Sequence, residues 1–270
     1  MPASEVQVPK VKFGNAEISR LIIGCNTFYG FAHFNNTLGQ AMTEYFTADR
    51  VCAVLHQCNR FGINTFNYYN GSRGLPDFQR FQAEGGKMHL IVQGQGDPTT
   101  VLQTLKPLSI YYHGESTDSA FKTGQMDTVR EWCKKVRDTG TIVGVGTHKP
   151  EVIQMVEEQG WDVDFYAGCV YNRTRTQDEV RKLLGGELPL GELYLADDPP
   201  RMYKVMKQTK KTCFAFKIMA AGRITNADQA FKLAFDSIKP TDAVFVGMFP
   251  KFRDEVRENA ERTHRILTGA

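Results

Sequence analysis

The sequence lacks the features that mark several classes of protein. No apolar run approaches the roughly 18 residues of a membrane-spanning helix, and residues 1–10 lack the apolar core of a signal peptide. Basic and acidic residues nearly balance, at 33 and 30, so the formal charge of +3 gives no electrostatic reason to expect nucleic acid as a partner. The six cysteines show no C-x-x-C spacing, which is typical of reduced thiols. We therefore expect a cytoplasmic protein that has no membrane partner.

The composition is otherwise that of an ordinary globular protein, with 41% hydrophobic and 23% charged residues. The length of 270 residues allows two domains of about 150 residues each or one α/β barrel of about 250 residues. Eight short apolar runs, rich in β-branched residues and too short for helices, recur along the chain. They are Leu21–Gly24, Thr65–Asn67, Leu90–Gln93, Ile110–Tyr112, Ile142–Gly146, Phe165–Ala167, Cys213–Phe216 and Ala243–Val246.

Helix-like segments separate these runs. Thr47–Phe61 places apolar residues at helical spacing, and Met126–Arg137 does the same. The alternation of eight strands with helices predicts an α/β fold, a single (β/α)8 TIM barrel domain over residues 1–270. A short hairpin over Val11–Ser19, with a Gly-Asn turn, is expected before the barrel. The alternative is an open doubly wound sheet, but no G-x-G-x-x-G follows the first strand.

Loops that follow the strands build the active face of such a barrel, and the longest are expected at Asn26–Thr47 and Asn172–Pro200. Many neutral hydrogen-bonding residues stand at predicted strand ends or in these loops. They are Asn26, Asn67, Tyr68, Tyr69, Asn70, Gln93, Gln95, Tyr171 and Asn172. This lining suits a small, polyhydroxylated substrate such as a sugar, because each hydroxyl needs a directional partner. Asn and Gln are also common in loops for purely local reasons.

Two histidines end adjacent predicted strands, His113 on the fourth and His148 on the fifth. Neighbouring strand ends in a barrel lie about 5 Å apart, so the two imidazoles can converge. With Glu115 they could ligate a divalent metal ion that keeps open coordination positions. The alternative is that His113 orients a substrate by hydrogen bonding, that His148 is a surface loop residue and that Glu115 points to solvent.

Lys217 stands inside an apolar run at a predicted strand end. A lysine there can act as a Schiff-base nucleophile, an electrophile or a proton donor. The alternative is a structural ion pair with a neighbouring carboxylate.

The segment from Gly62 to Gly71, G-I-N-T-F-N-Y-Y-N-G, resembles the second strand of the aldo-keto reductases, which typically reads G-I-N-x-F-D-T-A-x-x-Y-G. Other landmarks of that family follow in order, over about residues 11–267. They are Ile18–Gly24, Ile110–His113, Gly140–Gly146, Phe216–Gly222, Val246-Gly247 and Glu258-Asn259. The resemblance implies a (β/α)8 barrel and NAD(P)H-dependent reduction of a carbonyl group.

The residues that carry hydride chemistry in that family are changed here. Its catalytic Asp corresponds to Asn67 and its Lys to Gln93, and only His113 matches cleanly. The loop with its catalytic Tyr is two residues shorter, so Tyr68 or Tyr69 can fill that role only after rearrangement. A tyrosine with a pKa near 10 and no cation beside it is a poor acid at neutral pH.

The cofactor anchors of the family are changed as well. Thr147-His148 replaces a Ser-Asn pair, and Gly168 stands where a Gln is usual. By the resemblance, Phe216 could stack on a nicotinamide, and Glu258 and Asn259 belong to the family's ending.

Three hypotheses follow. The first is a lyase or isomerase that moves protons on a carbonyl-bearing, sugar-like molecule with His113, His148 and Lys217. The second is a divergent NAD(P)H-dependent oxidoreductase that binds its cofactor at Phe216, Glu258 and Asn259. The third is a barrel that binds a small molecule without catalysis. The sequence carries no signal of oligomeric state.

Overall fold

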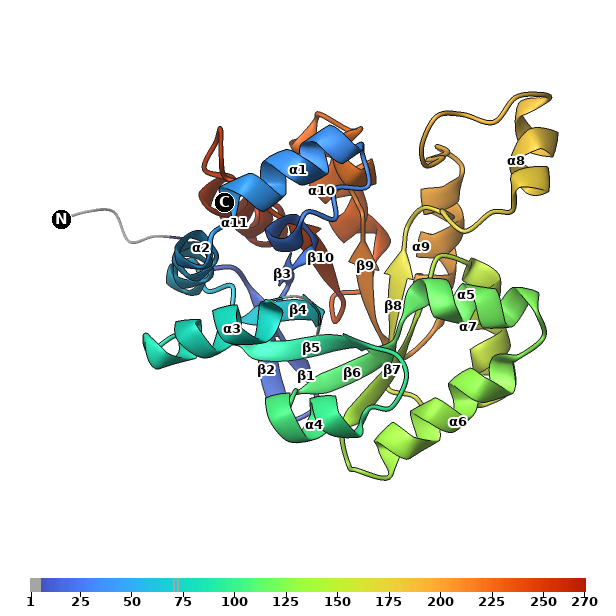
Figure 1. Cartoon of the computed structure of the whole chain (residues 1–270), viewed down its shortest axis with the longest axis horizontal. Coiled ribbons are helices and arrows are strands. Elements are labelled where there is room, and N and C mark those ends of the chain that lie inside the picture. The colour runs from blue at the N-terminus through green and yellow to red at the C-terminus, as the bar shows by residue number, and fades with distance from the viewer. Residues whose placement is uncertain (1–5, 70, 72) are drawn as a thin grey trace.

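The computed structural model describes residues 6–69, 71 and 73–270, so the predicted polar residue Asn70 lies outside the described residues. Eight parallel strands form a closed barrel in the order β10-β3-β4-β5-β6-β7-β8-β9 (Figure 1). The strands are β3 (Leu21–Gly24), β4 (Thr65–Tyr69), β5 (His89–Gly94), β6 (Ser109–Tyr112), β7 (Ile142–Thr147), β8 (Phe165–Cys169), β9 (Thr212–Phe216) and β10 (Ala243–Gly247). The prediction of a (β/α)8 barrel is confirmed, and the open sheet is excluded because β10 pairs with β3.

The predicted hairpin is also present and covers the amino-terminal end of the barrel. Strands β1 (Lys10–Phe13) and β2 (Ala16–Ser19) pair in antiparallel fashion around Gly14, whose φ is 59°. Phe13 enters the barrel interior, where its ring lies 5.3 Å from that of Phe165 and 5.2 Å from that of Phe214. With this end filled by aromatic side chains, the carboxyl ends of the strands are left to form a site.

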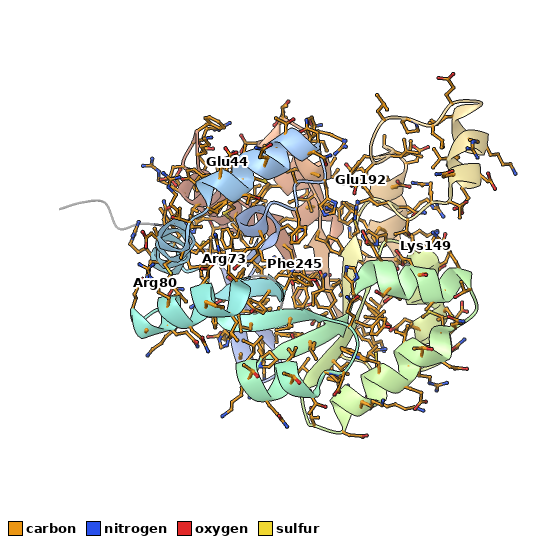
Figure 2. All side chains as sticks on the ribbon, viewed as in Figure 1. Glu44, Arg73, Arg80, Lys149, Glu192 and Phe245 are labelled. Carbon is orange, nitrogen blue, oxygen red and sulfur yellow. The ribbon has the colours of Figure 1, made fainter. Side chains whose placement is uncertain are left out.

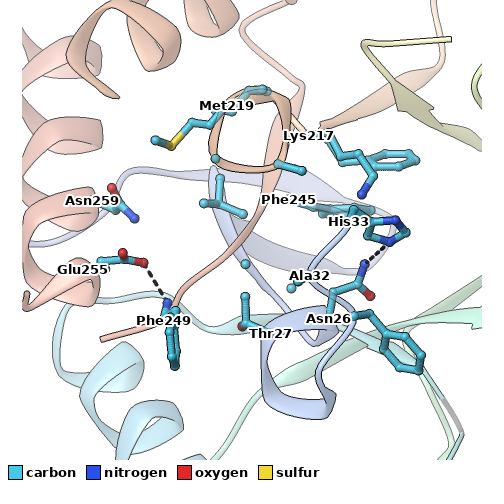
Figure 3. Close-up of a pocket in the computed structure, with 18 of the residues that line it drawn as sticks. Asn26, Thr27, Ala32, His33, Lys217, Met219, Phe245, Phe249, Glu255 and Asn259 are labelled. Carbon is cyan, nitrogen blue, oxygen red and sulfur yellow. Dashed lines mark hydrogen bonds between the residues drawn. The ribbon is translucent and has the colours of Figure 1, made fainter. Parts of the chain in front are cut away.

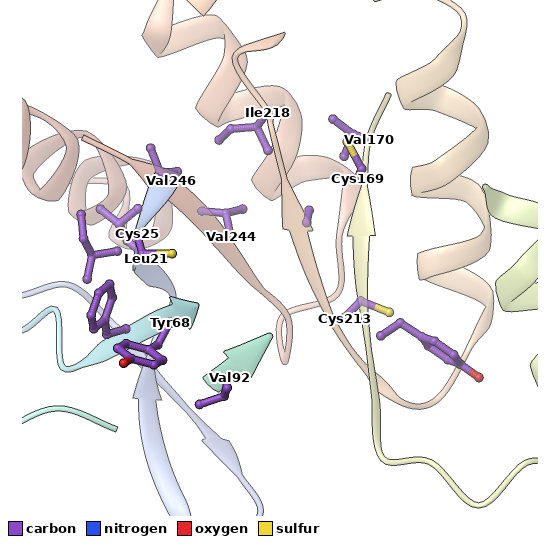
Figure 4. Close-up of a cluster of buried hydrophobic side chains, with 14 of the residues drawn as sticks. Leu21, Cys25, Tyr68, Val92, Cys169, Val170, Cys213, Ile218, Val244 and Val246 are labelled. Atoms are coloured by element: carbon purple, nitrogen blue, oxygen red, sulfur yellow. The ribbon is translucent and has the colours of Figure 1, made fainter. Parts of the chain in front are cut away.

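Helices surround the barrel. They are α1 (Asn36–Tyr45), α2 (Ala48–Arg60), α3 (Gly74–Ala83), α4 (Thr99–Leu105), α5 (Gly114–Lys122), α6 (Met126–Arg137), α7 (Pro150–Glu158), α8 (Gln177–Leu184), α9 (Asp198–Gln208), α10 (Ala227–Ser237) and α11 (Glu255–Thr268), with short 3-10 turns η1 (Asn26–Tyr29) and η2 (Ala220–Gly222). The helices pack on the strands through an apolar layer, part of which is shown in Figure 4. In α2, for example, Val51, Val54, Leu55 and Cys58 follow helical spacing and are buried.

The two segments expected as long loops carry helices of their own. The first contains η1 and α1, whose amino terminus is capped by Asn35 accepting a hydrogen bond from the Leu38 amide. The second contains α8, which begins with a capping box between Thr176 and Glu179 and projects away from the barrel (Figure 1). The polar residues that made these segments look like loops thus include the residues that cap the helices.

All six cysteines are free, as the lack of C-x-x-C spacing predicted, and all six are buried. Among the described residues, no helix combines the length and the apolar character needed to cross a membrane.

Candidate active site

A cavity of about 350 Å³ opens at the carboxyl ends of the barrel strands (Figure 3). Its inner end, over the barrel axis, is polar. That end is lined by Asn26, His33, Asn67, Gln93, Tyr111 and Lys217. Its outer end reaches between α1 and the start of α11. That end is lined by Leu38, Met42, Phe249, Glu255, Glu258 and Asn259. This volume lies at the lower end of the range for small-molecule sites.

Lys217 follows β9 directly and lines the inner end of the cavity. Its φ of 60° is left-handed, as are those of Ala220 and Ala221 in the same turn, so backbone strain gathers at this side of the cavity. Within the part of the chain that the structure describes, its amine forms no hydrogen bond or ion pair, and it points toward the His33 ring (Figure 3). Burial, assisted by the positive charge of Arg173, lowers the pKa of Lys217 to about 8.

Tyr111 joins the amides of two predicted substrate-binding residues at the inner end. Its hydroxyl lies 3.1 Å from Asn67 Oδ1 and 3.2 Å from Gln93 Oε1. One hydroxyl hydrogen can be donated to only one of these oxygens at a time. Burial raises the pKa of Tyr111, so the phenol stays protonated at neutral pH. Both Asn67 and Gln93 lie at strand ends, as the sequence predicts, and both line the cavity.

Arg173 binds several groups at the barrel mouth through one buried guanidinium. Nε donates to Glu192 Oε2 at 2.7 Å, and Nη2 also donates to the Glu192 carboxylate. Nη1 donates to Glu115 at 3.2 Å and lies 3.3 Å from His148 Nε2, while Nη2 lies 2.9 Å from His33 Nδ1. Although burial opposes it, hydrogen bonding to Glu192 raises the pKa of Arg173. The guanidinium thus ties the β8–α9 segment to the loop after β3.

His33 is the imidazole that faces the cavity. Its Nδ1 lies 2.8 Å from Glu192 Oε1, and its Nε2 lies 3.4 Å from the amide nitrogen of Asn26. The Asn26 side-chain nitrogen can only donate, so Nε2 accepts in this contact. The ring proton is then on Nδ1 and is donated to Glu192, which also accepts from Arg173 beside Nδ1. Burial lowers the pKa of His33, so the ring is neutral and can act as a base near pH 7.

The three predicted metal ligands do not come together as a metal site. His148 Nδ1 lies 2.8 Å from Asp118 Oδ2, and Arg173 occupies the space beside both His148 and Glu115. His113 Nδ1 lies 3.3 Å from the hydroxyl of Ser116. No group of three or more His, Cys, Asp or Glu among the described residues could hold a metal ion. A positive guanidinium among the proposed ligands is the physical reason, so the structure does not support the metal hypothesis.

His148 is also not the surface loop residue that the alternative interpretation described. It is 3% exposed, and its ring packs 5.7 Å from that of Phe216. Burial lowers the pKa of His113, which does not line the cavity.

Four further predicted residues lie away from the cavity. Tyr68 points into the apolar layer beside Phe66 and Phe78, because side chains alternate along β4 and Asn67 faces the barrel interior. Tyr69 packs on Phe31, with ring centroids 6.0 Å apart. Gln95 is exposed and accepts a hydrogen bond from Ser116, and Tyr171 is buried against Tyr194. None of the four lines the cavity.

The three residues expected to hold a nicotinamide cofactor do line the cavity. Phe216 precedes Lys217 and lines the cavity. Its ring stacks on that of Phe245 with centroids 6.5 Å apart, and Phe245 lies within the barrel (Figure 2). Glu258 pairs with Arg253 at 2.6 Å, and Asn259 Oδ1 accepts from Arg262 at 2.6 Å.

The charges of the outer end do not fit a dinucleotide. Its two arginines are already paired, Arg253 with Glu258 and Arg262 with Asp228, and the carboxylates of Glu255 and Glu258 lie on the same wall. A diphosphate that bound among these lining residues would meet these carboxylates, and both arginines that line this end are paired with carboxylates.

Sequence reasoning missed four residues of this site: His33, Tyr111, Arg173 and Glu192. Tyr111 was noted only as part of a strand. The other three lie in the two segments that were expected to form the active face, and the signal was a charged or ionisable side chain in each.

Comparisons with known proteins show the fold and no family. No family model matches the sequence, and a search of curated proteins finds no match. A structure from Pseudomonas aeruginosa, provisionally described as an aldo-keto reductase, shares 12% identity over 99% of this chain and 98% of its own, with a TM-score of 0.65. Another with the same description shares 13% identity over 98% and 96%, with a TM-score of 0.63. A truncated 3-deoxy-D-arabino-heptulosonate 7-phosphate synthase from Thermotoga maritima shares 12% over 98% and 92%, with a TM-score of 0.55. The chain is thus similar in fold to proteins with different activities.

Proposed function

We propose that this protein is an enzyme that acts on a small, carbonyl-bearing molecule through a Schiff base at Lys217, as a lyase or an isomerase. The observation that carries the proposal is an unpaired lysine, with a pKa lowered to about 8, at the inner end of the cavity. A neutral amine is the nucleophile in imine formation, and lowering the pKa of a lysine makes that form available near neutral pH.

In the first step the Nζ lone pair attacks the carbonyl carbon, and a C–N bond forms. As the C=O π bond breaks, the oxygen takes one proton from the attacking nitrogen and a second from solvent, and it leaves as water when the C–O bond breaks, which gives a protonated imine. A base then removes a proton from the adjacent carbon, and the C–H electron pair moves toward the imine nitrogen. Returning a proton to the opposite face of the same carbon restores the imine and epimerises the substrate, whereas breaking a carbon–carbon bond to that carbon instead of C–H makes the reaction a lyase reaction. Water finally hydrolyses the imine and restores the amine.

His33 is the group best placed to move these protons. Its Nε2 is an acceptor, its ring faces the cavity, and the Lys217 amine points toward it (Figure 3). Glu192 fixes the ring through Nδ1 and is a positioning residue. Asn26, Asn67 and Gln93 supply neutral hydrogen-bonding groups that suit a hydroxyl group next to the carbonyl.

Hydride transfer is less well supported by the same residues. Asn67 and Gln93 replace the charged pair that tunes the acid in the aldo-keto reductases, and burial raises the pKa of Tyr111, the tyrosine that lines the cavity. A phenol with a raised pKa and no adjacent cation is a weak acid.

Reductive trapping tests the proposal. The protein is incubated at pH 8 with glycolaldehyde or dihydroxyacetone and cyanoborohydride, and modified lysines are located by peptide mass. We expect Lys217 to be modified first, and Lys217→Arg to lose this modification while keeping a positive charge. Lys210→Arg, at an exposed position on the same chain, is the control and leaves Lys217 labelling unchanged. Labelling spread over exposed lysines with no preference for Lys217 would overturn the proposal.

A further inference from the structure

The cavity extends well beyond the groups that the proposed chemistry needs. Beyond the polar groups around Lys217, apolar side chains line the cavity between the two ends and lie beside the charged groups of the outer end. They are Leu38, Met42, Ile218, Met219 and Phe249. Met42 and Ile218 are 6% and 5% exposed, so they form part of the packed structure and not a loose rim. A reacting carbonyl and its neighbouring hydroxyl would leave this apolar part of the cavity empty.

One polar atom at the far end has no partner. Asn259 is 6% exposed, and its Oδ1 accepts a hydrogen bond from Arg262 at 2.6 Å. Its amide nitrogen has no acceptor among the described residues and lies on the cavity side (Figure 3). An amide donor that faces the cavity and has no acceptor in the protein is free to donate to an acceptor on a bound molecule.

The charge of the outer end selects against an anionic occupant. Arg253 and Arg262 are paired within the protein, and two carboxylates, Glu255 and Glu258, line the wall. Burial raises the pKa of Glu255, which shows how little solvent stabilises a negative charge there. A neutral chain or ring fits this wall better than a phosphate or carboxylate, which would lie beside the two carboxylates.

We propose that the outer end of the cavity binds an apolar extension of the substrate itself, ending in a neutral hydrogen-bond acceptor that meets the Asn259 amide. This inference rests on the proposed function and names its substrate class: a carbonyl compound with an apolar arm of several carbon atoms. The carbonyl lies at Lys217, the arm lies along Met219 and Phe249, and the acceptor lies at Asn259.

A series of aldehydes tests the arm. Butanal and octanal have similar intrinsic reactivity toward amines, and each buried methylene tightens binding about fourfold. We expect half-maximal trapping at Lys217 at a concentration at least tenfold lower for octanal than for butanal. Leu38→Gln should raise the octanal value several-fold and leave the butanal value unchanged. Leu233→Gln is the matched control, since Leu233 is 52% exposed on α10 and does not line the cavity. Equal values for the two aldehydes would overturn the inference.

The acceptor is tested with an aldehyde of the same length that ends in a methyl ester. Wild-type protein should trap the ester at lower concentration than octanal, and Asn259→Asp should lose this preference while keeping an oxygen for Arg262. If no aldehyde labels Lys217, the proposed function fails, and the outer end is tested by calorimetry with 1-octanol, which needs no amine. Binding of 1-octanol that Leu38→Gln weakens supports the apolar site, and absence of binding overturns it. Micromolar NADPH binding that displaces 1-octanol would also overturn it.

Discussion

Arg173 and Lys217 are two basic residues at the same barrel mouth, and their surroundings shift their pKa values in opposite directions. The Arg173 side chain, 6% exposed, contacts Glu192, Glu115 and two imidazoles, and its pKa is raised. Lys217 has no such partner among the described residues, and burial lowers its pKa to about 8. The positive charge of Arg173 is therefore part of what holds two segments together, whereas the positive charge of Lys217 is opposed by its site. This contrast separates a structural cation from a reactive amine.

The largest expected difference between the two residues is in how their substitution changes the free energy of unfolding. Arg173→Met leaves the partly buried carboxylate of Glu192 without its main partner and should lower the free energy of unfolding by about 3–5 kcal/mol. Lys217→Met removes a charge that burial opposes and should leave the free energy of unfolding unchanged or raise it. Urea denaturation at pH 7 measures both.

The pH dependence of the free energy of unfolding tests the expected effect of Lys217→Met. Its folded pKa, about 8, is below its unfolded value of about 10.4, so protonation costs folding stability most below pH 8. That cost disappears as the pH rises from 8 toward 10.4, and the advantage of Lys217→Met should disappear with it. Similar losses of stability in both variants at pH 7 would contradict the contrast.

The next effect concerns His33. His33→Asn should slow proton exchange at the carbon next to a bound carbonyl by about 100-fold, because a positioned general base typically contributes 10²–10⁴-fold. Imine trapping at Lys217 should remain, since His33 is not the nucleophile. Deuterium incorporation into dihydroxyacetone, followed by NMR, is the measurement. His56→Asn is the control because His56 forms a similar pair with Glu84, at 3.0 Å, on the surface of α2. An equal loss of exchange in both variants would show that His33 has no special role.

The smallest effect is the pH dependence of trapping. Only the neutral amine attacks a carbonyl, so the rate at Lys217 should rise with pH and level off above its pKa of about 8. Between pH 7 and pH 9 the neutral fraction rises roughly tenfold. Rates of Lys217 modification measured from pH 6.5 to 10.5 check this, and a rate that still rises roughly tenfold from pH 9 to pH 10 would place the amine among ordinary lysines.

The barrel and the amino-terminal hairpin could be predicted from sequence because both depend on local patterns. Short β-branched runs such as Ile142–Gly146 and the Gly-Asn turn at Gly14 report on backbone conformation over a few residues. The positions of Asn67, Gln93 and Lys217 were also predictable, since strand ends of a parallel barrel meet at one face.

The partners at the barrel mouth could not be predicted in the same way. Arg173 and Glu192 are 19 residues apart, and Arg173 and His33 are 140 apart, so their contacts depend on how long segments fold back over the barrel. Tyr68 shows the limit of motif reasoning: strand alternation beside Asn67 turns it away from the cavity. His148 shows another, because the carboxylate that it meets, Asp118, lies on α5 and gives no local signal.

The titration of the Lys217 amine decides most directly whether this residue is a reactive amine. Labelling lysine side chains with 13C at Cε and following them by NMR from pH 6 to pH 11 gives the pKa of each amine, and Lys217→Arg assigns the signal. We expect a midpoint near 8 for Lys217. A midpoint at the ordinary value near 10.4 would contradict it, because Lys217 would then be a charged residue like those on the surface.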